Sequence, residues 1–154
     1  MFKGILIPTL LLFLSSCGYE AIHSKKNSIN YNFSVTQLTF VGDRDVNVKI
    51  KEELNNYTLN KKDKSFDLKI SSSKENVVLA KDAAGDPTSF KLTIIVNIDV
   101  MLKDKFKSNL QIIEKFDYNN DANKFNLKRY EKEIINNLAE TASQKLVYKL
   151  SSIK

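Results

Sequence analysis

The sequence predicts an α+β fold, a two-layer sandwich in which a mostly antiparallel, four-stranded sheet carries two helices on one face. Every second residue from 90 to 102 is apolar, whereas the positions between them are mixed and include Ile95 and Met101. A period of two is that of a strand with one buried face. Residues 46–57 and 127–151 instead place apolar side chains every three or four positions, the period of an amphipathic helix. One apolar sheet face and two apolar helix faces are buried together in a single sandwich.

The first strand and the first helix are expected in residues 31–57. Residues 31–41 are rich in β-branched and aromatic side chains, which is typical of a strand. Their apolar parity changes between Val35 and Leu38, which indicates a β-bulge. A Gly-Asp pair ends the strand, and Asp43 or Asp45 is expected to cap the helix, since Asp is a favoured N-cap residue.

The second and third strands are expected on either side of a loop at residues 81–89, which contains a glycine and a proline. The second strand begins with alternating apolar residues at 66, 68 and 70. Serines and the run 74–76 weaken it before Val77, Val78 and Leu79 resume it. The third strand is residues 90–102, and its apolar face is expected to contact the long helix. The residues expected to meet there are Ile94, Val96 and Ile98 on the strand, and Ile134, Leu138 and Ala142 on the helix.

The fourth strand and the second helix complete the order β-α-β-β-β-α. Residues 103–108 are predicted to form a turn. Residues 110, 112, 116 and 118 of the strand that follows share one parity and are apolar. A loop at 119–123 then leads to the long helix, for which Asn126 is the expected N-cap. The opposite face of the sheet is left uncovered, so a partner could bind there.

The composition excludes several classes of site. The chain has 154 residues with 24 Lys+Arg and 18 Asp+Glu, a formal net charge of +6. A single cysteine and a single histidine exclude a disulfide framework, a cysteine zinc site and any site that needs two histidines. The carboxylate pairs Asp43/Asp45 and Glu131/Glu133 have spacings that suit caps and solvated helix faces. We therefore expect no metal, no cofactor and no enzymatic activity.

The first seventeen residues predict export and a lipid anchor. A basic start precedes eleven largely apolar residues, 4–14. As a helix they would span about 16 Å, too short for a hydrocarbon core of about 30 Å, so they are typical of a secretory signal. Ser15 and Ser16 precede Cys17, which resembles the lipobox of bacterial lipoproteins, in which the cysteine is acylated.

The lipobox divides the chain into three parts: a signal peptide at 1–16, an acylated cysteine with a tether at 17–30, and one sandwich domain at 31–154. Residue 18 is Gly and not Asp, which by analogy with the sorting rule of enteric bacteria favours the outer membrane. A plain signal peptide with a chance cysteine, and a cytosolic protein with an apolar N-terminal helix, are the alternatives.

The positive charge has two interpretations. Of the 24 basic residues only Arg44 and Arg129 are arginines, which is as typical of an AT-rich genome as of a selected basic surface. A nucleic-acid partner is not expected, because that interface favours arginine and stacking aromatic residues. The lysines could be solvated, or could bind a phosphorylated glycolipid such as lipopolysaccharide. The candidate ligand-binding residues are Lys103, Lys105, Phe106 and Lys107 in one cluster, and Lys81 and Lys91 around the other loop.

The order and spacing of several motifs resemble the lipopolysaccharide-assembly lipoprotein family (LptE), in its alphaproteobacterial form. The resemblance covers nearly the whole chain, but residues 20–22 depart from the Pro-Leu-Tyr-like run that the family often has after the anchor. The matching positions are Leu14-Ser15-Ser16-Cys17-Gly18-Tyr19, Gly42-Asp43-Arg44 with Asn47, Lys81-Asp82 with Gly85, Phe116 and Tyr118, Asn123-Lys124-Phe125, Tyr130-Glu131 with Ile134, and Asn137-Leu138.

The resemblance implies a non-enzymatic lipoprotein that plugs a large outer-membrane β-barrel (LptD-like), supports its assembly and helps deliver lipopolysaccharide to the outer leaflet. The implied partners are this barrel, lipopolysaccharide, and the membrane through the lipid anchor. The domain would lie on the periplasmic side of the outer membrane or inside the barrel. The alternative is an auxiliary lipoprotein of a periplasmic ABC-type lipid transport system.

Overall fold

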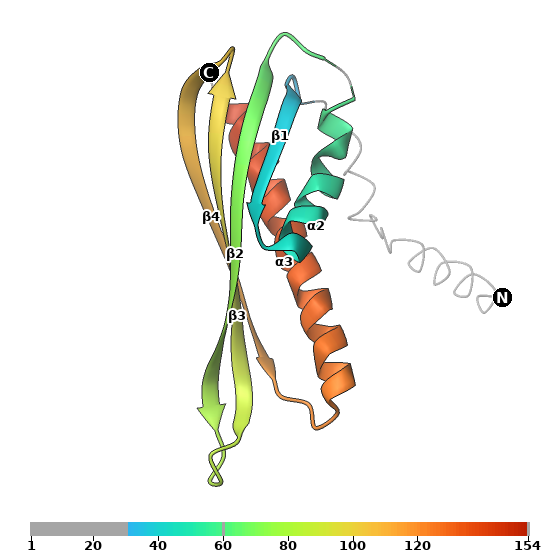
Figure 1. Ribbon diagram of the computed structural model, residues 1–154, viewed down its shortest axis with the longest axis vertical. Helices are drawn as coiled ribbons and strands as arrows, with labels where there is room; N and C mark the ends of the chain where they lie inside the picture. Colours follow the sequence, from blue (N-terminus) through green and yellow to red (C-terminus); the bar gives the residue numbers. More distant parts are fainter. Residues whose placement is uncertain (1–30, 60, 154) are drawn as a thin grey trace, which may run out of the picture. The chain divides into compact units, whose positions relative to one another are not determined.

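The computed structural model describes residues 31–59 and 61–153, which form a sheet of four strands in the order β1-β2-β3-β4 with helices packed on one face (Figure 1). The order of elements is β1, α2, the 3₁₀ helix η2, β2, β3, β4 and α3. This confirms the α+β sandwich and the order β-α-β-β-β-α. The sheet is mixed, because β1 pairs in parallel with β2 while the other pairs are antiparallel.

The first strand and helix are where the sequence predicts them. β1 is Ser34–Gly42, and its register against β2 shifts between Val35 and Gln37, which confirms the bulge. α2 is Arg44–Leu54 and continues into η2, Asn55–Tyr57. Asp43 is the N-cap of α2, and the apolar stripe of the helix is buried. A parallel β1–β2 pair requires a crossover between its strands, and α2 forms that crossover.

The next three strands form an antiparallel meander. β2 is Ser65–Lys81, β3 is Pro87–Leu102 and β4 is Lys105–Asn119. β2 is continuous, so the serines and the charged run do not interrupt it, because its partner β3 supplies backbone hydrogen bonds along the whole length. The β2–β3 loop is shorter than the predicted 81–89 for the same reason, and Pro87 begins β3.

The predicted turn at 103–108 is wrong in extent. The β3–β4 connection is only two residues, Lys103 and Asp104, with φ angles of 51° and 61°. This is the left-handed backbone that favours Gly, Asn and Asp and that matches the twist of a two-residue hairpin. Residues 105–108 therefore belong to β4, and the register against β3 shifts between Val100 and Met101, so Lys107 forms a β-bulge between Phe106 and Ser108.

The last helix, α3, is Lys124–Ser152 and begins three residues earlier than the sequence predicts. Its N-cap is Asn123 and not Asn126, because the Asn123 side-chain oxygen accepts hydrogen bonds from the backbone N–H groups of Phe125 and Asn126. Both residues are asparagines, so residue type alone does not distinguish them. The earlier start adds almost one turn to α3.

One hydrophobic core lies between the sheet and the two helices. Val96 is 1% exposed, and the inward parity of β3 is buried throughout its middle. The six residues expected to meet across the layers all belong to this core, which confirms the predicted face of β3. The largest fully buried side chains are Phe33, Phe66, Ile50, Leu54, Leu68, Ile70, Ile94, Ile98, Leu146, Leu150, Val35 and Val46.

The two ends of the sandwich differ. The β3–β4 turn, the start of β1 and the segment that enters β2 lie at one end, whereas the β2–β3 loop and the β4–α3 loop lie at the other (Figure 1). β1 is also much shorter than β2, and its pairing stops at Ser72. Within the described residues, the remaining part of β2, residues 73–81, has a strand neighbour only on the β3 side.

Candidate functional site

The predicted lysine cluster around Phe106 occupies the β3–β4 hairpin. Lys103, Lys105 and Lys107 are all exposed, and within the described part of the chain no ion pair involves them. Phe106 pairs with Met101 across the hairpin and is 62% exposed. The hairpin therefore presents three free ammonium groups around an exposed aromatic ring, which is the combination expected for contact with phosphates and acyl chains.

Lys81 and Lys91 do not belong to this surface. They lie towards the β2–β3 loop, and Lys91 is separated from Lys103 by about 40 Å of β3 at 3.3 Å per residue. The Lys91 ammonium lies 3.8 Å from an Asp117 carboxylate oxygen on the neighbouring strand. The structure thus divides the predicted basic residues between opposite ends of the domain.

A second basic loop, which the sequence analysis did not single out, lies at the same end as the hairpin. It follows η2 and contains Leu59, which is 69% exposed, and the exposed Lys61. Lys64 follows, and its ammonium lies over the Phe66 ring at 5.7 Å from the centroid. Phe66 pairs with Leu102, so this segment enters the sheet beside the β3–β4 turn. An exposed leucine before a run of lysines is a signal that sequence inspection could have found.

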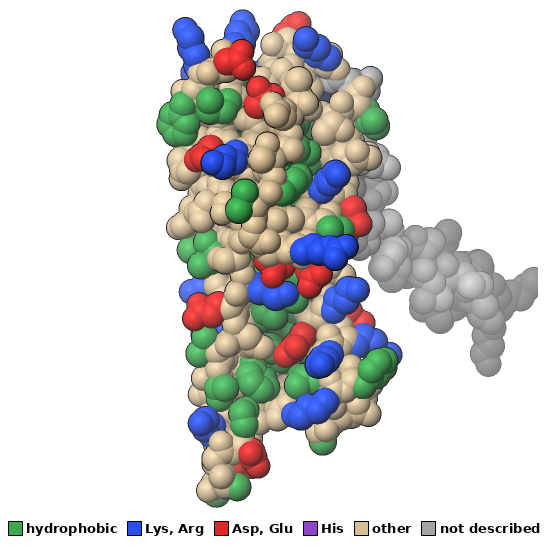
Figure 2. Space-filling model, in the orientation of Figure 1, with side chains coloured by type: hydrophobic (Ala, Val, Ile, Leu, Met, Phe, Trp, Pro, Cys, Tyr) green, Lys and Arg blue, Asp and Glu red, His purple; other side chains and the backbone are tan. Residues whose placement is uncertain are grey.

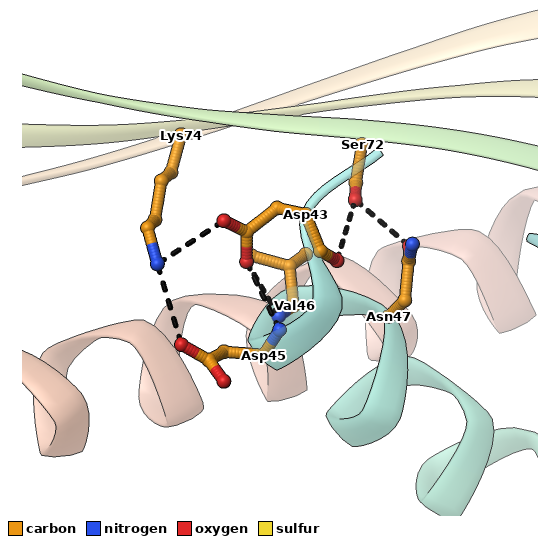
Figure 3. A network of polar contacts seen from close by, with 6 residues as sticks. All are labelled: Asp43, Asp45, Val46, Asn47, Ser72 and Lys74. Atoms are coloured by element: carbon orange, nitrogen blue, oxygen red, sulfur yellow. Dashed lines mark hydrogen bonds and ion pairs between the residues drawn. The ribbon is translucent and has the colours of Figure 1, made fainter. Parts of the chain in front are cut away.

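A polar network joins β2 to the start of α2 (Figure 3). Asp43 Oδ1 accepts hydrogen bonds from the backbone N–H groups of Asp45 and Val46, each at 3.1 Å. The Lys74 ammonium lies 3.1 Å from Asp43 Oδ2 and 3.3 Å from Asp45 Oδ2. Ser72 Oγ lies 2.8 Å from Asn47 Oδ1. The predicted Asp43/Asp45 pair is therefore a helix cap bridged by a lysine.

The charges in this network stabilise one another. Burial opposes ionisation of Asp43, but the hydrogen bond from the Val46 N–H and the contact with Lys74 outweigh it, so the pKa of the carboxyl group is lowered. Burial likewise opposes protonation of Lys74, but the Asp43 and Asp45 carboxylates outweigh it and raise the pKa of the ammonium group. Neither group is a candidate proton donor near neutral pH. The contacts between Lys74 of β2 and the two aspartates at the start of α2 instead hold the helix on the sheet.

The other predicted carboxylate pair, Glu131/Glu133, is divided, because Glu131 is half-buried and Glu133 is exposed. Glu131 Oε1 accepts a hydrogen bond of 2.5 Å from the buried Tyr118 hydroxyl, and Asn76 Nδ2 lies 2.6 Å from the same hydroxyl oxygen. Burial and the Glu131 carboxylate together raise the pKa of Tyr118 to about 12. This bridge connects β2, β4 and α3, so Glu131 has a structural partner of its own.

The predicted signal peptide at 1–16 and the predicted acylated cysteine and tether at 17–30 lie outside the described residues. Within residues 31–59 and 61–153, neither helix has a stretch long and apolar enough to cross a membrane.

The fold is that of several bacterial lipoproteins. Rare lipoprotein B from Shewanella oneidensis matches with a TM-score of 0.59 at 17% identity over 75% of this chain and 94% of that one. A minor lipoprotein from Acinetobacter baumannii matches with a TM-score of 0.54 at 12% identity, over 79% and 92% of the two chains. Lipoprotein B from Nitrosomonas europaea matches with a TM-score of 0.52 at 10% identity, over 79% and 86%. No protein-family model and no curated protein matches the sequence.

Proposed function

We propose that this chain is a non-enzymatic outer-membrane lipoprotein that plugs and supports the assembly of a lipopolysaccharide-translocating β-barrel, and helps deliver lipopolysaccharide to the outer leaflet. The observation that carries the proposal is the shared fold with rare lipoprotein B and the other bacterial lipoproteins, which extends over most of each chain. Identities of 10–17% establish the fold alone, so the role rests on the fold together with the lipobox at Cys17.

Identification of the chain's partner in the membrane tests this proposal. An affinity-tagged, acylated chain would be extracted in detergent from the bacterium that encodes it, and the captured proteins would be identified by mass spectrometry. We expect a large outer-membrane β-barrel to be captured in near-stoichiometric amount. Capture of ABC-transporter and substrate-binding subunits without a barrel would overturn the proposal in favour of the auxiliary-lipoprotein alternative.

Removal of the acylated thiol tests the anchor. Cys17→Ala is expected to abolish incorporation of a labelled fatty acid and to leave the precursor uncut before residue 17, because acylation requires the sulfur and cleavage follows it. Metabolic labelling and the mass of the mature protein check both outcomes. Acyl label that persists on the variant would contradict a lipid anchor at Cys17, and with it the outer-membrane location.

Charge reversal at the hairpin tests the contact with lipopolysaccharide. A variant with Lys103→Glu, Lys105→Glu and Lys107→Glu is expected to bind lipopolysaccharide at least about tenfold more weakly, since exposed charge pairs are individually weak but three are reversed together. Lys124→Glu, Lys128→Glu and Lys132→Glu make the same change in charge on the exposed side of α3 and serve as the control. Equal binding by the hairpin variant and the wild type would exclude this hairpin.

A further inference from the structure

The end of the domain where the described chain begins carries two exposed hydrophobic side chains, each beside lysines. Leu59 is 69% exposed in the loop before β2, and Phe106 is 62% exposed just after the β3–β4 turn. Together the segments 61–64 and 103–107 contain six lysines against two aspartates. Basic side chains also project from this end, the upper one, of the space-filling view (Figure 2). Apolar tips bordered by lysines are characteristic of surfaces that contact the interface of a bilayer.

The segment that connects the predicted anchor at Cys17 to the domain joins it at this same end, where Tyr31 is the first described residue. The Lys62 ammonium donates a hydrogen bond of 2.7 Å to the Tyr31 carbonyl, and the Tyr31 and Tyr57 rings lie 6.1 Å apart. The Ser34 N–H donates to the Lys64 carbonyl at 2.9 Å. Tyr31 is therefore fixed beside the loop that carries Leu59 and Lys61.

The chain length between the anchor and this end limits its distance from the membrane. Thirteen residues separate Cys17 from Tyr31, and they span at most about 45 Å when fully extended and about 20 Å as a flexible coil. The β2–β3 loop is farther from Tyr31 by the length of β3, about 50 Å for its 16 residues. Of the two ends, the tether therefore holds the basic end nearer to the bilayer.

We infer that this end docks on the anionic phospholipid surface in which the acyl chains of Cys17 are anchored, with Leu59 and Phe106 entering the interface and Lys61, Lys64, Lys103, Lys105 and Lys107 facing the phosphates. The inference rests on the lipid anchor of the proposed function and adds a second, direct contact between the domain and the membrane. Basic residues near an anionic surface are attracted to it, so we expect five lysines to give measurable binding without acylation.

Vesicle binding tests the inference on the chain from residue 17 onward with Cys17→Ser, which carries no acyl group. We expect sedimentation with vesicles of phosphatidylglycerol and phosphatidylcholine, no binding to phosphatidylcholine alone, and weaker binding as salt rises. Changing the five lysines to glutamine should weaken binding at least about tenfold. The control changes five exposed lysines outside this end to glutamine and should bind like the parent: Lys81, Lys115, Lys124, Lys128 and Lys132.

The chain contains no tryptophan, so the fluorescence of a single introduced tryptophan reports whether position 59 or position 106 enters the membrane interface. Leu59→Trp and Phe106→Trp should each show a blue-shifted emission with anionic vesicles. Phe125→Trp, at a 74% exposed position at the start of α3 and the opposite end of the domain, should not. Equal losses from both lysine sets, a shift at position 125 alone, or binding to lipopolysaccharide without binding to phospholipid would overturn the inference. Acyl labelling and barrel capture test the proposed function, whereas vesicle binding tests the docking on phospholipid. Failure of the proposed function is therefore distinguishable from failure of this inference.

Discussion

Val96→Asp is expected to destabilise the domain by about 3–5 kcal/mol, since it places a carboxylate without a partner in the middle of the core. Val96 is at the centre of β3, between Ser72 and Ile112 on the neighbouring strands, and its side chain is 1% exposed. Natural domains are stable by only about 5–15 kcal/mol, so the variant should melt at a much lower temperature or fail to fold. Thermal and urea unfolding of the chain from residue 17 onward would measure the loss.

The adjacent position supplies the control. Asn97 points to the uncovered face of the sheet, where its side-chain oxygen accepts a hydrogen bond of 2.9 Å from Gln111 Nε2. Asn97→Asp introduces the same carboxyl group and retains this acceptor, so it should change the free energy of unfolding by less than about 1 kcal/mol. Similar stability of the two variants would contradict the inward orientation of Val96.

Gly42→Ala is expected to cost about 3 kcal/mol or more, because two independent constraints require glycine where β1 passes into α2. Its φ angle is +99°, a conformation that other residues adopt only with strain. A Cβ atom built at this position would lie 1.9 Å from the Ser72 carbonyl oxygen. That oxygen also accepts a hydrogen bond from the Asp43 N–H, so the backbone cannot move away without breaking the contact that begins the α2 cap.

Gly85→Ala isolates the cost of the dihedral angle from the cost of the clash. Gly85 has a φ of +92°, but a Cβ atom there would meet nothing within 4 Å. Urea unfolding of both variants should show a small loss for Gly85→Ala, about 1 kcal/mol, and a loss at least twice as large for Gly42→Ala. Equal losses would show that the β1–α2 corner can adjust to a methyl group.

The regular elements were predictable because burial on one side imposes a period on the sequence. Burial alternates along β3 because helices cover only one of its faces. The buried residues of α2 recur just as regularly, at a period of four residues. The junctions were less predictable. The β3–β4 turn uses Lys103 and Asp104 where the Asn-Gly signal of such turns is missing. The start of α3 depended on which of several asparagines is the cap.

Only the part of the candidate site that is contiguous in the sequence was predictable. The lysines around Phe106 are adjacent in the sequence, so inspection finds them, whereas their proximity to the loop at 59–64 is a consequence of the β2–β3 pairing. The same pairing moves Lys81 and Lys91 to the opposite end, although they are closer in sequence to Lys103 than Lys61 is. Sequence patterns identify clusters along the chain, but only the register of the strands determines which clusters share an end.

Among the described residues, the unequal lengths of β1 and β2 leave part of β2 without a strand neighbour on one side, and such an edge can pair with a strand of another copy. Residues 73–81 include Val77, Val78 and Leu79, each at least 40% exposed, and a run of high β-propensity without proline on an open edge is a typical starting point for aggregation. Lys74, Glu75 and Lys81 border the run, and the register of β2 shifts between Val78 and Ala80. Charges and a bulge oppose the addition of another strand. This edge therefore combines an aggregation-prone run with the features that limit its aggregation.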